Sequence, residues 1–331
     1  MSLLNIIYII FGALIILGSS TYVVRSLTQL AHFFGLSGFT ISFILMAFAT
    51  SIPELIIGIN AAISGSPEIS LGNILGTNIV NLTLVLGLVA LISGRIVMDD
   101  YQRFSTNRLF NFFLVMSPVV LLLDGYLSRI DAVILLAFFG WSLAHMLEFR
   151  KHIKGKTFRG FWKTTVANAI KGVLISTKSF FKNLFVFVAG IAALTVASHY
   201  FIIGAKNISI SFGLSEILIG VFVVGLGTSL PELAFGIKAA KSKQGGMSLG
   251  NIFGSSVVNS TLILGITALI APITISDTSV FWVSVIFMGF TMLLAYYLLR
   301  SKDFLIRTEG LVLILIYAIF IVVQGAFCFS C

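Results

Sequence analysis

Charged residues are scarce in this sequence: Asp, Glu, Lys and Arg make up only 10% of its 331 residues, whereas 58% are hydrophobic. A soluble domain carries about 25% charged residues. Apolar stretches of about 20 residues, long enough to cross a hydrocarbon core roughly 30 Å thick, recur along the whole chain. The composition therefore argues against a soluble globular protein and predicts an all-α, polytopic membrane protein.

Cysteine is also nearly absent, and the two residues present, Cys328 and Cys331, form a single C-x-x-C sequence at the C-terminal end. A redox or metal-binding role for such a pair needs a βαβ unit or a second pair of ligands, and the sequence offers neither. We interpret the pair as incidental and expect no cofactor. The first apolar segment lacks the basic region and cleavage site of a signal peptide, so we expect it to be a membrane span.

Enzymatic motifs are missing as well. Neither H-E-x-x-H nor G-x-S-x-G occurs, and the four histidines lie near loops or the ends of predicted helices. We therefore expect the protein not to be an enzyme.

Hydrophobic stretches separated by polar connections predict ten transmembrane helices. Their approximate ranges are 3–24, 37–64, 70–93, 108–124, 129–148, 183–203, 213–241, 247–271, 279–299 and 305–327. The longest polar connection, 149–182, separates two sets of five. We accordingly predict a first five-helix repeat over 1–148, a basic connecting loop over 149–182 and a second repeat over 183–331.

The basic residues fall almost entirely on one side of this arrangement. If the N-terminus faces outside, 19 of the 21 Lys and Arg residues lie in inner loops, and the outer side keeps only Arg129 and Lys206. This positive-inside pattern predicts both termini outside and loop 149–182 in the cytoplasm, in the cell (inner) membrane. Because membrane orientation explains the placement of the basic residues, the net positive charge does not indicate nucleic-acid binding. We expect membrane lipid as a partner, no nucleic acid and no obligate protein partner.

Two segments of the sequence repeat each other without a gap. Between residues 50–87 and 228–265, at a constant offset of 178, 22 of 38 positions are identical. The shared sequences include Thr-Ser-x-Pro-Glu, Ser-Leu-Gly-Asn and Asn-x-Thr-Leu. Because each half contains five spans, the second copy should cross the membrane in the opposite orientation. Such inverted repeats are typical of secondary transporters, whose sites lie near the bilayer midplane.

Of the twelve acidic residues, only Glu54 and Glu232 lie deep inside a predicted span, at equivalent positions of the repeat. An ionised side chain at the bilayer centre costs at least about 2.5–3.5 kcal/mol, so an intramembrane carboxylate indicates a functional site. A structural ion pair would be the alternative, but every Lys and Arg lies outside the predicted spans or at their ends. We therefore interpret both residues as cation ligands.

Each glutamate follows a proline, Pro53 or Pro231, that should break the helix and free backbone carbonyls around 47–50 and 225–228. Nearby hydroxyls complete an all-oxygen set, which suits hard cations such as Ca²⁺. These hydroxyls belong to Thr50, Ser51, Thr228 and Ser229.

The next predicted helix of each half carries three polar residues at positions i, i+4 and i+8, which place them on one helix face. The two stripes are Asn73, Thr77, Asn81 and Asn251, Ser255, Asn259. We expect Asn73 and Asn251 to bond neighbouring helices, and the other four residues to face the carboxylates. Gly72 and Gly76, like their equivalents, should allow close helix packing.

Two copies of Gly/Ala-Thr-Ser-x-Pro-Glu followed by Gly-Asn-x-x-Gly-Ser/Thr resemble the repeats of sodium/calcium exchangers, and the resemblance extends over essentially the whole chain. It implies an inverted five-plus-five fold in which helices one and six move to open a central site alternately to each side. Several ligand roles are implied too: carboxylates from Glu54 and Glu232, hydroxyl and carbonyl oxygens from Thr50 and Thr228, backbone carbonyls from Ala47 and Gly225, side-chain oxygens from Thr77 and Ser255, and amides from Asn81 and Asn259 at the centre.

The chain departs from some members of that family at Asn259, where archaeal and potassium-dependent members place an Asp. Two formal negative charges remain instead of three, which argues against potassium dependence. The sequence as a whole predicts an antiporter that exchanges Na⁺ for Ca²⁺. A Ca²⁺/H⁺ antiporter using the same carboxylates and a passive cation channel remain as alternatives.

Overall fold

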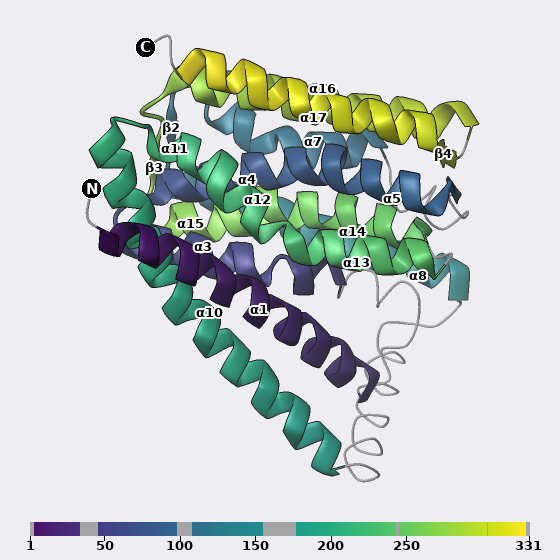
Figure 1. Cartoon of the computed structure of the whole chain (residues 1–331). Helices are drawn as coiled ribbons and strands as arrows, with labels where there is room; N and C mark the ends of the chain where they lie inside the picture. The colour runs from purple at the N-terminus through teal and green to yellow at the C-terminus, as the bar shows by residue number, and fades with distance from the viewer. Residues whose placement is uncertain are drawn as a thin grey trace.

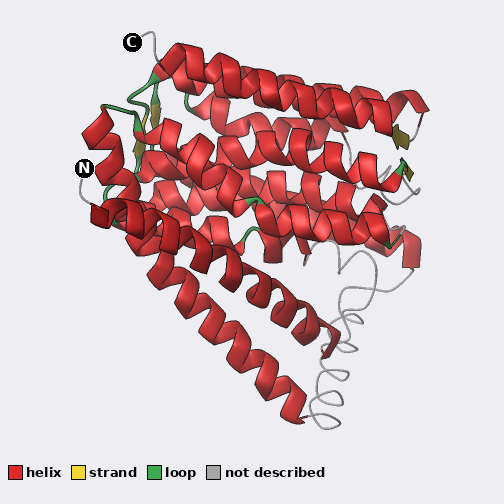
Figure 2. Cartoon of the chain, in the orientation of Figure 1, coloured by secondary structure: helices red, strands yellow, loops and turns green. Residues whose placement is uncertain are grey.

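The computed structural model describes residues 3–33, 46–97, 108–154, 177–242, 245–302 and 304–328. The start of the second predicted span, Cys331 and most of the basic connection 149–182 therefore lie outside the described residues. The described chain is helical apart from two short strand pairs (Figures 1 and 2).

Most helices begin or end close to a boundary of a predicted span. In the first half they are α1 (Leu3–Phe33), α3 (Ile52–Ile63), α4 (Pro67–Val80), α5 (Leu86–Ser93), α7 (Arg108–Leu121) and α8 (Arg129–Lys154). In the second half they are α10 (Thr177–Phe212), α11 (Glu216–Ile219), α12 (Gly225–Thr228), α13 (Leu230–Lys241), α14 (Gly245–Val257), α15 (Leu264–Ile270), α16 (Thr278–Lys302) and α17 (Arg307–Cys328). Helices α1, α8 and α10 extend beyond the predicted apolar ranges, since polar residues at their ends continue the helix.

Three π-helical turns lie inside the central helices, where single-turn π-bulges commonly mark functional positions. They are η1 (Asn81–Val85), η2 (Gly220–Val224) and η3 (Val258–Ile263). Turns η1 and η3 join α4 to α5 and α14 to α15. The pattern of apolar residues did not predict them, because a π-turn changes the helix register by only one residue.

Seven helical stretches among the described residues are long and apolar enough to cross a membrane. They are Asn5–Leu27, Pro67–Ser93, Ser179–Phe212, Glu216–Lys241, Met247–Ile270, Thr278–Leu299 and Arg307–Ala326. Ile52–Ile63 and Leu109–Leu121 are shorter apolar helices.

Polarity in this bundle is reversed relative to a soluble protein. Large apolar side chains such as Phe185, Ile286 and Val322 are exposed on its periphery, whereas Glu54 and Asn73 are buried at its centre. An apolar perimeter around a polar interior is what a hydrocarbon solvent favours, since exposed apolar groups cost nothing in lipid.

Two antiparallel strand pairs lie at opposite ends of the bundle (Figure 1). Strand β1 (Arg95–Val97) pairs with β4 (Phe304–Ile306), and β2 (Tyr126–Leu127) pairs with β3 (Ile273–Thr274). Each strand pair links an interhelical loop of the first half to an interhelical loop of the second half. With two or three residues each, the strands carry no recognisable alternation and were not predicted.

Helix α4 lies at the centre and is buried on nearly every side. Gly72 and Gly76 bring its backbone against Ile217 and Val221 of α11 and η2, and Gly220 approaches α4 in return. The prediction that these two glycines allow close packing is confirmed.

Helices α1 and α10 pack along each other and run away from the rest of the bundle towards one end (Figure 1). Near the opposite end α10 is bound to α3: the amide of Asn60 donates to the hydroxyl of Ser198 and, at 3.1 Å, to the carbonyl of Thr195. The α3 face beneath α10 is therefore covered.

Candidate functional site

The helices that carry the two intramembrane glutamates are interrupted just before them. Residues 46–50 are helical, the chain turns at Ser51, and α3 begins at Ile52; the same break separates α12 from α13 at Ser229. In both cases proline is the second residue of the new helix, where its missing N–H costs no hydrogen bond. The interruption expected from the prolines is confirmed.

Glu54 and Glu232 are 0% and 1% exposed, respectively. None of their four carboxylate oxygens accepts a well-formed hydrogen bond within the described residues, although the hydroxyls of Thr228 and Thr50 lie near Glu54 and Glu232, respectively. The two groups are close enough to repel each other electrostatically. Because a buried carboxylate is stable only when it is paired or protonated, this pair has the charge and the free oxygens to hold a cation.

Threonines at the two helix breaks bind asparagines from the opposite half of the chain. The hydroxyl of Thr50 donates to Oδ1 of Asn251 at 3.3 Å, and the hydroxyl of Thr228 donates to Oδ1 of Asn73 at 3.0 Å. Asn73 and Asn251 thus bond neighbouring helices, as expected, and they fix the hydroxyls beside the carboxylates.

Thr77 lies within the same cluster. Its hydroxyl is 3.1 Å from that of Thr228 and 3.3 Å from the carbonyl oxygen of Gly225. The stripe on α4 therefore meets the helix break of the second half directly, which brings Thr77, Thr228 and Gly225 together.

The predicted serine ligands differ in their present partners. The hydroxyl of Ser51 is buried without a partner among the described residues. Ser229 donates to the carbonyl of Gly225 at 2.6 Å, and Ser255 donates to the carbonyl of Ile252 at 3.1 Å. All three oxygens keep lone pairs that can bind a cation.

The carbonyls of Ala47 and Gly225 accept backbone hydrogen bonds, both at 3.3 Å, from Ser51 and Ser229. They are less free than the proline argument suggests, because the carbonyls that lack an N–H donor are those four residues before each proline, Ala49 and Gly227. Ala47 and Gly225 remain predicted ligands, but the Gly225 oxygen also accepts the hydroxyl of Ser229, so a cation there would have to replace one of its present donors.

Asn81 and Asn259 are fully buried at the start of π-turns η1 and η3. Neither amide atom of Asn81 has a partner in the described part of the chain, and Oδ1 of Asn259 has none. Unpaired buried amides carry a desolvation cost, which a bound cation would offset for the oxygens.

The sequence interpretation missed Asn78 and Ser260. Both are buried, and the amide of Asn78 donates to the hydroxyl of Ser260 at 3.1 Å. As for the two stripes, the available signal was a polar side chain inside an apolar span. However, Asn78 and Ser260 lie on a different helix face, and the residues 178 positions away from them are not identical to them.

The predicted ligands are carboxylate, hydroxyl, amide and carbonyl oxygens from both halves of the chain. Oxygen-only sites with two carboxylates favour hard cations such as Ca²⁺ over softer transition metals.

Comparisons with known proteins agree with this chemistry. The family model for sodium/calcium exchanger proteins matches residues 4–147 and 182–326. The sodium/calcium exchanger MaX1 of Methanosarcina acetivorans is 29% identical over 96% of this chain and 98% of its own length. An uncharacterised membrane protein of Methanocaldococcus jannaschii is 32% identical over 78% of this chain and 80% of its own length.

Among solved structures, too, the chain is similar to a sodium-calcium exchanger. The sodium-calcium exchanger NCX_Mj, soaked with 2.5 mM Na⁺ and 1 mM Sr²⁺, matches this chain with a TM-score of 0.64 and 28% identity. The match covers 97% of this chain and 99% of NCX_Mj.

Proposed function

The chain belongs to the sodium/calcium exchanger protein family, and from that premise we propose that it exchanges Na⁺ for Ca²⁺ across the membrane by alternating access. It is a multi-pass membrane protein of all-helical fold, and its family makes it a cation/Ca²⁺ exchanger. The observation that carries the finer proposal is the pair of buried carboxylates, Glu54 and Glu232, neither of which has a basic partner among the described residues.

We propose ten spans in two inverted five-helix repeats, 1–148 and 183–331, joined by the loop 149–182. Three observations support this: the gapless sequence repeat, the family match that falls into two stretches, and the strand pairs at opposite ends. Gly12 and Gly190, which are 178 residues apart, both lie where α1 and α10 touch.

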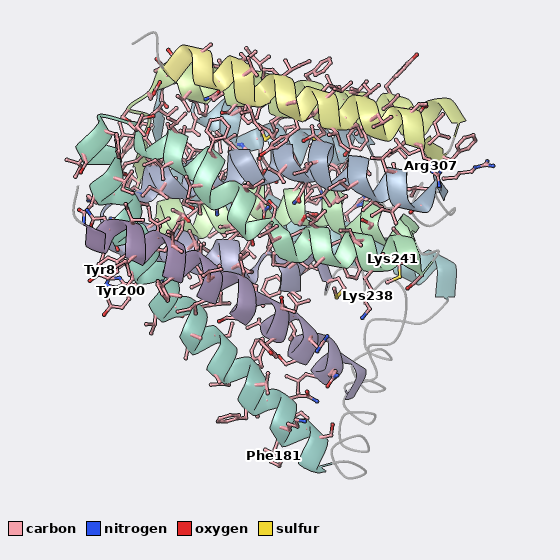
Figure 3. The ribbon with its side chains drawn as sticks, viewed as in Figure 1. Tyr8, Phe181, Tyr200, Lys238, Lys241 and Arg307 are labelled. Atoms are coloured by element: carbon pink, nitrogen blue, oxygen red, sulfur yellow. The ribbon has the colours of Figure 1, made fainter. Side chains whose placement is uncertain are left out.

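The proposed orientation places both termini outside, in the cell (inner) membrane. Lys238, Lys241 and Arg307 lie at one end of the bundle (Figure 3), and the start of α1 and the end of α17 lie towards the other end (Figure 1). A basic end facing the cytoplasm agrees with the positive-inside rule. Loop 149–182 would extend the same basic face.

Alternating access is supported by a difference between equivalent faces of α3 and α13. Ile52 is 6% exposed beneath α10, whereas Leu230, its equivalent, is 37% exposed. Asn60 is bound to α10, whereas Lys238, at the same position of the second half, is exposed. If α1 covered α13 as α10 covers α3, the site would open to the other side, so we propose that α1 and α10 move together between these positions.

The proposed ligands are the predicted oxygens from both halves: Glu54, Glu232, Thr50, Thr228, Ser51, Ser229, Ala47, Gly225, Thr77, Ser255, Asn81 and Asn259. Two ionised carboxylates neutralise one Ca²⁺ or two Na⁺. An empty site leaves two like charges uncompensated in a low-dielectric interior, which is unfavourable in an occluded state. A loaded carrier can therefore switch readily and an empty one poorly, and this difference couples the two fluxes.

Replacing Thr228 tests the proposed role of the cross-repeat hydroxyls. Thr228→Val should lower the apparent Ca²⁺ affinity roughly tenfold, because it removes an oxygen of the site and leaves Asn73 without that donor. Thr228→Ser keeps the hydroxyl and should stay within about threefold of wild type. Both are measured as the Ca²⁺ concentration for half-maximal uptake; equal effects of the two substitutions would contradict a hydroxyl role.

The function itself is tested by Ca²⁺ uptake into proteoliposomes preloaded with Na⁺, compared with K⁺, choline or a pH gradient. We expect rapid uptake only with internal Na⁺. Because residue 259 is Asn, adding K⁺ together with Na⁺ should not increase the rate of Ca²⁺ uptake. Uptake that ignores Na⁺ but follows the pH gradient would instead establish a Ca²⁺/H⁺ antiporter, and a leak that needs no counter-ion would indicate a passive channel.

A further inference from the structure

A chain of buried hydrogen bonds reaches the candidate site from a helix that contributes no predicted ligand. The side-chain amide of Asn78 on α4 donates to the hydroxyl of Ser260 at 3.1 Å and contacts the sulfur of Met288 on α16 at 3.7 Å. Its Oδ1 accepts a bond from Nδ2 of Asn259 at 3.4 Å. All four residues are at most 1% exposed.

The thioether of Met288 fixes the direction of this chain. A thioether sulfur can accept a hydrogen bond but has no proton to donate, so the atom of Asn78 beside it must be the NH₂ group. The oxygen of Asn78 then faces Asn259. Only the NH₂ group of Asn259 can approach that oxygen favourably, which leaves Oδ1 of Asn259 on the other side of its amide.

That oxygen is buried and has no hydrogen-bond partner within the described residues. Asn259 shares its helix stripe with Asn251, which binds Thr50 beside the carboxylates. The free oxygen of Asn259 thus belongs to the face of the helix that borders the site.

We propose that Asn78, oriented by Met288 and Ser260, is a positioning residue that holds the amide of Asn259 with its oxygen towards the bound cation. This inference rests on the proposed function and adds a determinant of cation affinity to it. The orientation matters because an amide is a dipole: its oxygen attracts a cation, whereas its NH₂ group repels one.

Asn81, the equivalent of Asn259 in the first half, has no such orienting partner among the described residues. The position equivalent to Asn78 is Ser256, which donates to the carbonyl of Ile252 in its own helix at 2.9 Å. Asn81 has no partner on either amide atom in the part of the chain that the structure describes. Asn259 is therefore pre-oriented, whereas no hydrogen bond within the described residues orients the amide of Asn81.

A carboxylate at position 259 would need no orientation, because both of its ends are oxygens. This difference supplies a test that separates positioning from packing. Asn78→Leu is made in wild type and in Asn259→Asp; leucine has the same branching as asparagine and the same number of heavy atoms, but it has no polar atom. Ca²⁺ affinity is measured by titration calorimetry in detergent without Na⁺, and folding is checked by thermal unfolding.

Asn78→Leu should weaken Ca²⁺ binding about tenfold when residue 259 is Asn, and by less than about twofold when it is Asp. Met288→Leu nearly conserves volume and leaves only Ser260, whose hydroxyl can donate as well as accept, to orient Asn78. It should weaken binding about threefold in the wild-type background alone. Ser256→Ala is the matched control and should leave affinity unchanged.

Equal losses in the wild-type and Asn259→Asp backgrounds, or no loss in either, would overturn the positioning role. A wild-type protein that shows the coupling between residues 78 and 259 but no Na⁺-driven uptake would support this inference while contradicting the proposed function. A wild-type protein that binds no Ca²⁺ at all would contradict both.

Discussion

Replacing Glu54 or Glu232 by glutamine should reduce Na⁺-driven Ca²⁺ uptake by at least about 100-fold, because removing the carboxylate from a buried carboxylate–Ca²⁺ pair costs roughly 3–5 kcal/mol. Each substitution leaves a single negative charge to hold a divalent cation. The two effects should be similar, since each half of the chain contributes one carboxylate at an equivalent position. Uptake into Na⁺-loaded proteoliposomes measures both.

The glutamine variants should remain folded. Glutamine has nearly the same shape as glutamate and removes a buried charge that has no partner in the described residues. In cation-free buffer their Tm should therefore equal or exceed that of wild type, and the rise in Tm on adding Ca²⁺ should disappear. This combination distinguishes a lost ligand from a misfolded protein.

Glu216→Gln is the matched control. Glu216 begins α11, and its carboxylate accepts a hydrogen bond from Ser66 at 3.0 Å, a bond that glutamine can also accept. It lies outside the candidate site, so uptake should stay within about threefold of wild type. Wild-type uptake in either Glu54→Gln or Glu232→Gln would contradict the assignment of the carboxylates.

Gly76→Ala should prevent stable assembly of the two halves. A Cβ at this position would overlap the backbone of Val221, including its carbonyl oxygen, so a backbone segment and not a flexible side chain would have to move. Overpacking of this kind costs about 1–3 kcal/mol or more. We expect a lower Tm, a smaller yield of monodisperse protein and loss of uptake.

The comparison is Gly140→Ala in α8, where an added Cβ would meet no atom within 4 Å. Alanine also favours a helix over glycine by about 1 kcal/mol, so Tm should stay constant or rise. If Gly76→Ala were as stable and active as Gly140→Ala, α4 and η2 could not be in backbone contact in the working protein.

The sequence predicted the two buried carboxylates better than the details around them. Glu54 and Glu232 were recognisable because a carboxylate that lies within an apolar span and has no basic partner is rarely a structural residue. The helix breaks at Ser51 and Ser229 followed from proline chemistry. The repeat motifs singled out threonines and asparagines such as Thr50 and Asn251, but pairing them across the halves required the folded chain.

Other features left no readable pattern. The strand pairs are too short to show alternation, and the π-turns at Asn81 and Val258 differ from an α-helix by one residue per turn. Asn78 was missed because it lacks an identical residue at the 178 offset, and its importance depends on Met288, which is 210 residues away. Contacts of this kind come from tertiary packing, and a single sequence does not encode them in a local pattern.

An experimental structure in Ca²⁺ would show whether the carboxylates of the two halves share one cation. We expect one Ca²⁺ bound by oxygens of both Glu54 and Glu232, at about 2.3–2.6 Å from each. A Ca²⁺ ion held by only one of the two, or bound elsewhere while both carboxylates pair with protein groups, would contradict it.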